Sequence, residues 1–458
     1  MTTVMSDFIS TWANPHLGEI IMMKKSIFAV AVASVLTLGA AQAETVLYGS
    51  IRYDYENKKA SSFSHGNATS AFTDANGAVI TGAGAGKYNS GSTWTRSSND
   101  RVSNLEDAGS RIGIKGNEDL GNGNAVIYQL EWAFDGMEQG NTGDGFKNRL
   151  AVLGLTGNWG TMTAGRQDNP FKVTIVDDSV VDAFNGSNVI NSASQRAMTT
   201  ALSGVRASSY THSTGYDNVH DLTNPANDIP GSVGAAATFY KNGLGDEPRA
   251  QFSRVGKSIA YTTPEFAGFQ ANVALVMDEA SAQEKHVDLW TVNARYAYDL
   301  GANGTILTKV GYIHSKLDSS VNFGTEKKPV YAQGAKAKSW GLFLGYSQDA
   351  FAVTANYAKG DHTYNGKTHK DKSTGWDLGA SYSFGANYFS TVRATYGESS
   401  LKTADRKDKV KSWAVGFEQK LSTRTRAWVE YGSQKEQFQS AGLKDKFDVI
   451  SVGMRHDF

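Results

Sequence analysis

The chain has 458 residues, with 45 basic and 45 acidic side chains and a formal net charge of zero. This balance gives no global sign of nucleic-acid binding, so any electrostatic function must come from local charge arrangement. The absence of cysteine excludes a disulfide scaffold, a thiolate metal site and a cysteine nucleophile. With 48 Gly, 20 Tyr, 21 Phe and only 7 Pro, the composition favours a β-rich fold.

The only long apolar run lies near the N-terminus, at residues 26–41. Two lysines precede it and small residues follow up to Ala43, which is the pattern of a cleaved secretory signal peptide. We therefore expect a signal peptide at residues 23–43 and a mature domain at residues 44–458. Residues 1–22 contain acidic side chains and a proline, which have no place in a signal, and we interpret them as a misassigned extension. A retained anchor is the alternative, but the run is shorter than the ~20 apolar residues that span a bilayer.

The mature chain alternates apolar and polar residues in segments of about ten, which is typical of membrane β-strands. In the first segment Ile51 and Tyr53 share one face, while Arg52 and Asp54 share the other. Sixteen such segments are expected, at 45–56, 108–118, 123–134, 148–157, 160–168, 254–263, 268–278, 286–299, 303–314, 338–349, 350–360, 373–384, 388–399, 409–421, 422–435 and 446–458. The pattern predicts an all-β, sixteen-stranded antiparallel transmembrane barrel. A soluble two-sheet sandwich is the alternative, but it would not explain the many Trp and Tyr residues at strand ends.

The connections between these segments alternate in length. Turns such as 121–123 and 385–387 are tight and rich in Gly and Asn, whereas 57–107 and 169–253 are long. Short periplasmic turns and long extracellular loops are typical of an outer-membrane barrel. All six prolines after residue 44 fall outside the expected strands, as a closed sheet requires. The last segment alternates apolar residues up to the terminal Phe458, which resembles the strand that the outer-membrane assembly machinery reads.

Several strings along the mature chain resemble the Gram-negative general porin family. They are Leu47-Tyr48-Gly49, Ser110-Arg111-Ile112-Gly113-Ile114-Lys115-Gly116, Glu118-Asp119-Leu120-Gly121-Asn122-Gly123, the segments 149–157, 254–259 and 264–269, Gly165-Arg166-Gln167, and Val452-Gly453-Met454-Arg455-His456-Asp457-Phe458. The resemblance implies a homotrimer of sixteen-stranded barrels, each a water-filled channel for ions and small hydrophilic solutes. It also implies that the third extracellular loop folds into the pore. The segments 57–107 and 169–253 are longer than the common family pattern needs.

A basic ladder is expected on the pore wall. The alternation places Arg52 and Arg111 in the lumen, because their neighbours Ile51 and Ile112 face lipid. By resemblance, Arg111, Arg149 and Arg254 match wall positions where the family carries basic side chains. Lys115 shares the lumen face of Arg111 but lies nearer the periplasmic turn. These residues could also merely solvate the lumen.

Acidic partners for this ladder are expected on the inward loop, at Asp177, Asp178 and Asp182. Carboxylates that face guanidinium groups across a narrow opening create a transverse field, which orients hydrated dipolar solutes and disfavours large apolar ones. The sequence therefore predicts a pore constriction that filters by size and charge.

Other functions remain open at this stage. A substrate-specific outer-membrane channel is the main alternative, and saturable conductance with one solute would distinguish it. We expect no enzyme, metal or cofactor: the nine histidines lie in no metal-binding motif, and residues 82–87 lack the spacing of a phosphate loop. A rim-mounted catalytic triad and an adhesin with long surface loops are further alternatives. We expect outer-membrane lipids and the assembly machinery as partners, and no nucleic acid.

Overall fold

A computed structural model describes residues 44–59, 61–65, 94–98, 101–137, 145–210, 253–277, 287, 289–317, 335–363, 370–402, 407–438 and 443–458. The expected extension 1–22 and signal peptide 23–43, and most of the segment 57–107, lie outside these residues. The described part of the chain contains no helix long and apolar enough to cross a membrane.

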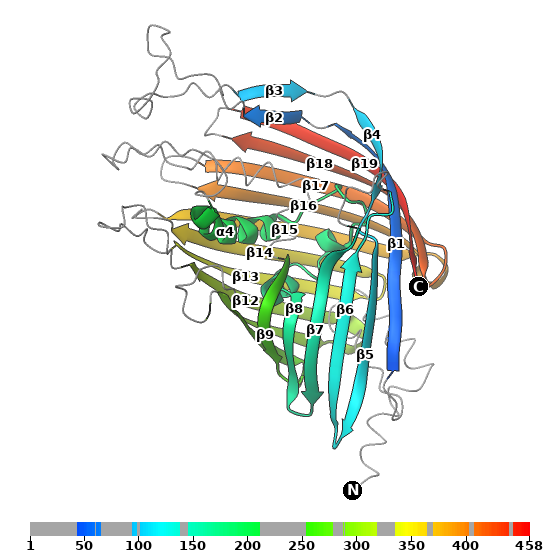
Figure 1. Cartoon of the computed structure of the whole chain (residues 1–458). Coiled ribbons are helices and arrows are strands. Elements are labelled where there is room, and N and C mark those ends of the chain that lie inside the picture. Colours follow the sequence, from blue (N-terminus) through cyan, green and yellow to red (C-terminus); the bar gives the residue numbers. More distant parts are fainter. Residues whose placement is uncertain are drawn as a thin grey trace, which may run out of the picture.

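One antiparallel sheet contains most of the described strands (Figure 1). They are β1 (Glu44–Lys59), β4 (Val102–Asp107), β5 (Arg111–Gly121), β6 (Asn124–Ala133), β7 (Lys147–Gly157), β8 (Gly160–Asp168), β9 (Arg254–Thr262), β10 (Phe269–Val276), β11 (Leu289–Asp299), β12 (Thr305–Leu317), β13 (Ala335–Gln348), β14 (Phe351–Thr363), β15 (Asp371–Phe384), β16 (Ser390–Lys402), β17 (Lys407–Lys420), β18 (Thr425–Phe438) and β19 (Leu443–Asp457). A separate hairpin pairs β2 (Ser61–His65) with β3 (Trp94–Ser98). The short helices η4 (Gly301–Asn303) and η5 (Ala386–Tyr388) lie in tight turns.

The sheet closes into a barrel because β1 pairs with β19 along one edge and with β4 and β5 along the other. β4 and β5 pair with successive parts of β1, so they form one barrel strand that is interrupted at residues 108–110. Counted in this way the barrel has sixteen strands, which confirms the predicted fold. The tight turns also lie where the sequence predicts them, for example at Gly121, Asn122 and Gly123, which all have positive φ.

The interruption explains why the sequence placed the second strand at 108–118 and missed β4. Leu105 of β4 pairs with Tyr55, and Ile114 of β5 pairs with Leu47. Tyr55 and Leu47 share the lipid face of β1, so Leu105 and Ile114 also face lipid, although their residue numbers differ in parity. The period-two pattern therefore changes phase at the break. The Asp107 carboxylate stabilises the break by accepting hydrogen bonds from the two backbone amides that follow Ala108, each at 2.7 Å.

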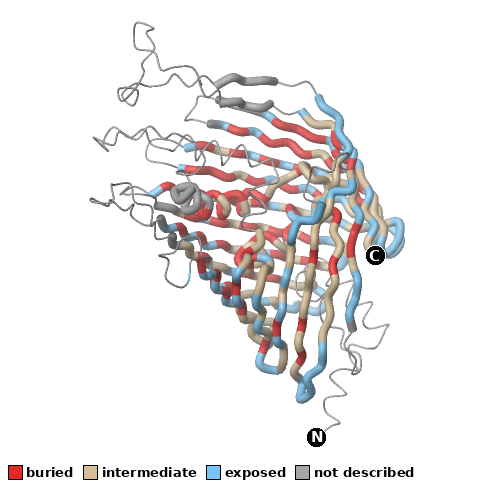
Figure 2. The backbone as a smooth tube through the Cα atoms, in the orientation of Figure 1, coloured by how far each residue is buried: buried red, intermediate tan, exposed pale blue. Residues whose placement is uncertain are grey.

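Buried and exposed residues alternate along the strands (Figure 2). Many polar residues are buried on the inner face and many large apolar residues are exposed on the outer face, as expected for a barrel in a membrane. A belt of aromatic side chains crosses eight consecutive strands on the outer face. Its members are Trp290 (β11), Tyr312 (β12), Trp340 (β13), Tyr357 (β14), Trp376 (β15), Tyr396 (β16), Trp413 (β17) and Tyr431 (β18), and neighbouring rings pack 5.1–5.6 Å apart in the pairs 290–312, 340–357, 376–396 and 413–431. Amphipathic rings at one height are typical of a membrane–water interface.

The segment after β8 folds into the barrel, as the resemblance implied (Figure 1). It contains α3 (Pro170–Ile175), the 3-10 helix η2 (Val180–Ala183) and α4 (Ala193–Tyr210), which pack against the inner wall from β10 to β17. α3 begins at a proline, which suits the first turn of a helix. The Asn169 side chain caps it by accepting a hydrogen bond from the Phe171 amide. Apolar side chains of this inward loop and of the wall form a buried cluster, which contains Phe171, Ile175, Val176, Ala197, Met198, Leu202, Val255, Val276, Leu289, Ile313, Ala337 and Ala358.

Glycines on the inner wall make room for the inward loop. A Cβ atom built on Gly341 would lie 2.5 Å from the Ile175 side chain, and one on Gly375 would lie 1.9 Å from the Ala193 carbonyl oxygen. Gly360 of β14, Gly379 of β15 and Gly432 of β18 likewise lie against loop atoms first. Gly311 of β12 and Gly416 of β17 lie against a wall side chain and then against the loop residues Phe171 and Phe184. The loop therefore rests in a groove that larger side chains would fill.

Candidate channel constriction

The inward loop runs along the inner wall in two passes. From residue 170 to residue 188 it passes from β11 and β12 to β1, and from residue 189 it returns along the wall as α4. The first pass carries the acidic residues that the sequence singled out, and its tip is the segment 185–188. Three sets of wall residues hold this path.

The first set holds the root of the loop. Lys309 of β12 donates from Nζ to Asp178 Oδ2 at 2.7 Å, to the Asp177 carbonyl oxygen at 2.9 Å and to the Val173 carbonyl oxygen at 3.3 Å. Within the loop, the Lys172 ammonium pairs with Asp177. Burial alone would lower the pKa of Lys172, but the neighbouring carboxylates, first of all Asp177, outweigh it and raise the pKa above the ordinary lysine range. Burial raises the pKa of Asp178, although Lys309 opposes this shift.

The second set holds the tip. Glu430 of β18 is buried, and its carboxylate accepts hydrogen bonds from the backbone amides of Asn185 at 3.0 Å and Gly186 at 2.9 Å. Glu418 of β17 accepts a bond from the Asn185 side-chain amide at 2.8 Å. Charged acceptors strengthen such bonds, so these two carboxylates fix the loop backbone.

Carboxylates of the neighbouring strands continue this row. Asp54 of β1 accepts from the Ser187 amide at 3.2 Å. Glu56, also on β1, accepts from the Asn188 amide at 3.0 Å and from its side chain at 2.8 Å, and Glu106 of β4 accepts from the same side chain at 3.1 Å. None of these acids was expected in the constriction, although the alternation put Asp54 on the lumen face.

The third set holds the start of α4. Asp377 of β15 is buried and accepts hydrogen bonds from the Ala193 and Ser194 amides at 2.7 and 3.0 Å, and from the hydroxyls of Ser192 and Ser194. A wall carboxylate thus caps the helix N-terminus, where negative charge is favourable.

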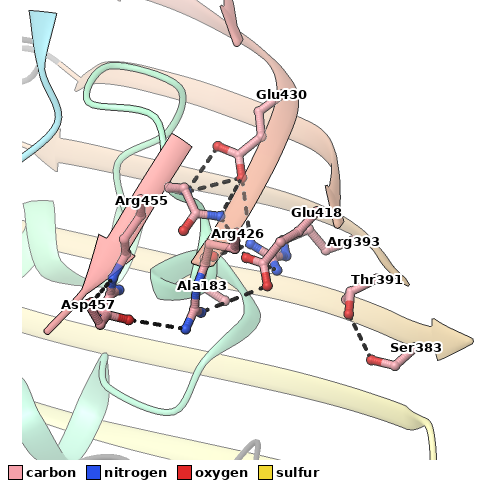
Figure 3. A network of polar contacts seen from close by, with 10 residues as sticks. Ala183, Ser383, Thr391, Arg393, Glu418, Arg426, Glu430, Arg455 and Asp457 are labelled. Atoms are coloured by element: carbon pink, nitrogen blue, oxygen red, sulfur yellow. Dashed lines mark hydrogen bonds and ion pairs between the residues drawn. The ribbon is translucent and has the colours of Figure 1, made fainter. Parts of the chain in front are cut away.

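A network of charged side chains continues from the tip along the wall (Figure 3). Arg393 of β16 donates to Glu418 at 3.0 Å and to the carbonyl of Ala183 in the loop, and it lies 3.5 Å from Glu430. Arg426 lies 3.8 Å from Glu418, which links the loop anchors to the arginines of the open wall.

The predicted basic residues lie on the wall that the inward loop does not cover. Arg149 forms an ion pair with Glu131 of β6, and Arg111 lies 3.9 Å from the same carboxylate. Arg254 pairs with Asp168 at 3.2 Å. Three arginines thus share two wall carboxylates.

Arg52 differs from these three. Its Nε donates to Ser50 Oγ at 3.0 Å, and within the described residues one of its terminal nitrogens is buried without a hydrogen-bond partner. The positive charges of Arg111, Arg455 and Arg149 act on it, and the negative charge of Asp457 opposes them. The structure therefore brings Arg52 together with the predicted ladder.

Three further basic residues extend this ladder. Arg52 lies directly opposite Arg455, Arg455 opposite Arg426, and Arg426 opposite Lys420, on the consecutive strands β1, β19, β18 and β17. Like charges that face each other across strands are unfavourable, so this row is kept at a cost in stability. The signal was present in the sequence, because Arg455 lies between two residues of the predicted lipid face.

The acidic residues of the loop divide into two groups. Asp177 and Asp178 are engaged with Lys172 and Lys309, and the Asp178 side chain is only 4 % exposed. Asp182 is 43 % exposed and lies 3.9 Å from Lys172, so it presents its carboxylate to the interior of the barrel. A role of these residues in charge filtering stays a prediction.

Two other predicted residues lie away from the constriction. Lys115 is on β5 toward the periplasmic turn, with its ammonium 5.4 Å from the centre of the Tyr48 ring. Phe458 closes the barrel, because its backbone exchanges hydrogen bonds of 3.1 Å with Gly49 of β1. Its role as an assembly signal stays a prediction.

Among the residues that the structure describes, no group of three His, Asp or Glu side chains is arranged to hold a metal ion.

Comparison with known proteins agrees with this geometry. A family model described as Gram-negative porin matches residues 29–438. The chain belongs to the Gram-negative porin family. It is 25 % identical over 447 residues to the major outer membrane protein P.IB of Neisseria gonorrhoeae, which covers 95 % of this chain and all of that protein. P.IB of Neisseria lactamica is 25 % identical over 459 residues, with the same coverage of both chains.

Solved porins share the fold of this chain. An anion-selective porin from Comamonas acidovorans superposes with a TM-score of 0.56 at 18 % identity, over 91 % of this porin and all of that chain. The trimer form of OmpT from Vibrio cholerae superposes with a TM-score of 0.55 at 11 % identity, with the same coverage. This porin resides in the outer membrane, where its barrel forms a water-filled channel for passive diffusion of ions and small hydrophilic solutes.

Proposed function

We propose that the Arg and Asp residues around the inward loop form a filter that selects solutes by size and favours anions. The basic part is the predicted set Arg52, Arg111, Arg149 and Arg254, extended by Arg426, Arg455 and Lys420. The predicted Lys115 is left out of it, because it lies nearer the periplasmic turn. The acidic part is reduced to the exposed Asp182, since Asp177 and Asp178 serve chiefly as anchors.

One observation carries this proposal: the row of four basic residues that face each other directly across β17, β18, β19 and β1. Asp457 is shared between Arg426 and Arg455, so the row keeps an excess of positive charge. Closely spaced positive charges lower the energy of an anion and raise that of a cation in the same opening. The resemblance in fold to an anion-selective porin is compatible with this reading.

Single-channel recording of the refolded porin in planar bilayers tests the proposal. We expect a reversal potential in a salt gradient that indicates anion preference, and a conductance that is insensitive to added sugars and peptides. Saturable block by one solute would support the alternative, a substrate-specific channel. A reversal potential that indicates cation preference would contradict the proposed filter.

We also propose that the porin is a homotrimer whose contacts lie on the side of β1 and β4–β8. The aromatic belt covers β11–β18, whereas exposed apolar residues on the other side are mainly aliphatic or Met, namely Val46, Leu47, Ile51, Val102, Leu105, Leu120, Leu153, Leu155 and Met162. Tyr55, Phe146 and Trp159 are the exposed aromatic residues on that side. Aliphatic surface suits a protein or lipid-tail contact, whereas Trp and Tyr suit the membrane interfaces. Chemical cross-linking in native membranes should yield a trimer, and a monomer only would contradict this proposal.

We further propose export through the signal peptide 23–43, and no catalytic activity. Sequencing the N-terminus of the protein from outer membranes should give Glu44, with translation starting at Met23. Loss of residues 1–22 from the gene should then leave expression unchanged, and a cytosolic precursor that starts at Met1 would contradict the misassigned start.

A further inference from the structure

Lys309 is a lysine of the barrel wall that is almost completely buried beneath the inward loop, with 3 % of its surface exposed. Its ammonium contacts three oxygens of the loop, the Val173 and Asp177 carbonyls and the Asp178 carboxylate. The ammonium also lies 4.8 Å from the centre of the Phe343 ring, which adds a favourable cation–π contact. A lysine has three donors, and each of them has an oxygen to meet here.

The contact falls at the turn that separates α3 from η2. Asp178 has a φ of 72°, a left-handed conformation that L-residues other than glycine adopt at a cost of roughly 1 kcal/mol or more. The Ser179 hydroxyl donates to the Val176 carbonyl and braces the same turn. Such a conformation persists only where the surroundings enforce it, and the Lys309 contacts provide that enforcement.

This turn determines where the exposed acid of the loop points. Asp182 follows Asp178 by four residues, within η2, and its carboxylate is the most exposed of the three loop acids. A change at the turn would therefore move both the loop edge that narrows the opening and the charge that it carries.

We propose that Lys309 is a positioning residue for the constriction, which sets the bore and steadiness of the pore by holding the turn at Asp178. The inference rests on the proposed function, because it assigns this residue a role in that filter. It assigns Lys309 no contact with solutes, so its removal acts on the loop and only indirectly on selectivity.

The chain offers a matched control in Arg295. This residue lies directly opposite Lys309 on the neighbouring strand β11, carries the same charge and pairs with Glu265 at 2.7 Å. It acts on Asp178 only as a nearby charge, whereas Lys309 donates hydrogen bonds to the loop. Neutralising either residue removes one positive charge from nearly the same place on the wall. Only the Lys309 change removes the loop anchor.

The test compares Lys309→Met with Arg295→Gln by single-channel recording. Removing one partner of a buried ion pair leaves the other charge uncompensated, so the population of displaced loops should rise on the order of 100-fold, the factor equivalent to about 3 kcal/mol. We expect larger open-channel noise and higher mean conductance for Lys309→Met, with Arg295→Gln close to wild type in both. Equal changes in both variants would reduce the effect to wall charge and overturn the proposal.

A reversible disulfide between loop and wall distinguishes the effect of loop position from the effect of the lost Lys309 charge. A Cβ on Gly341 approaches the Ile175 side chain, and the chain contains no native cysteine, so Ile175→Cys with Gly341→Cys can form a disulfide between loop and wall. In the Lys309→Met background, oxidation should restore quiet conductance and reduction should abolish it. Noise that is the same in both redox states would overturn the proposal.

Two results keep the outcome clear. If Lys309→Met does not refold, Asp178→Asn weakens the same contact and leaves Lys309 in the wall. This variant should also show larger open-channel noise than the wild type. Wild-type noise in Asp178→Asn would overturn the proposal. The assay is independent of ion preference. If the pore prefers cations but Lys309→Met is noisy, the proposed filter fails and the positioning role stands.

Discussion

Neutralising Arg52 is the most direct perturbation of the proposed filter. Arg111, Arg149 and Arg254 share wall carboxylates, so their removal also frees an acid, whereas the described residues give Arg52 a hydroxyl partner rather than an ion pair. Arg52→Gln therefore removes one positive charge with little rearrangement. We expect a weaker anion preference and an unchanged fold.

The size of the effect follows from Coulomb's law. An ion that passes about 7 Å from a unit charge through water gains or loses roughly 0.6 kcal/mol, and screening at 0.1 M salt about halves this energy. Anions and cations shift in opposite directions, so the difference between them changes by about 0.6 kcal/mol. The ratio of anion to cation permeability should therefore fall about threefold.

Reversal potentials in a salt gradient measure this ratio directly. Lys336→Gln provides the control, because Lys336 is exposed, shares the outer face of β13 with Trp340 and carries the same charge away from the row of basic residues on β17, β18, β19 and β1. The control should leave the ratio near its wild-type value. An unchanged ratio in Arg52→Gln, or an equal change in both variants, would refute the reasoning.

Three further outcomes are expected. Asp377→Asn keeps the shape of the cap but removes its charge, so urea unfolding in detergent should show a loss of roughly 2 kcal/mol, and an unchanged midpoint would contradict the cap. Gly375→Val places side-chain atoms against the Ala193 carbonyl and should displace α4, which would appear as altered conductance; wild-type conductance would show that the groove has spare room. The raised pKa of Lys172 means that its ion pair with Asp177 contributes fully below pH 10.5 and is lost as the pH rises through the raised value. Open-channel noise should therefore increase only at strongly alkaline pH, and Lys172→Met should be noisy throughout.

The sequence was sufficient to predict the barrel because its constraint is local. Each strand must alternate between lipid and water, and each tight turn needs residues such as Asn122 that tolerate positive φ. The alternation did not predict β4, because residues 108–110 lie outside the strands and shift the phase of the pattern. A strand that continues in the opposite phase cannot be recognised from alternation alone.

The candidate site was only partly predictable for a different reason. Alternation can place Arg52 or Arg455 inside the barrel, because that depends on neighbours along one strand. It cannot show that Asp178 meets Lys309, because 131 residues separate them along the chain. Nor can it show that Glu430 meets Gly186 of the loop tip, because 244 residues separate these two. The inward loop carries no repeat from which its path could be derived.

The row of wall glycines has a consequence for how this pore can vary. From β12 to β18 the inner surface of the barrel fits the loop, so a new side chain there would act on the loop before it met a solute. Solutes instead meet the loop edge and the arc that runs from Lys420 and Arg426 at the ends of β17 and β18 through β1 to β9. A porin built in this way can change its selectivity by substitutions on that arc, while the opposite half of the wall must keep the small residues against which the loop packs.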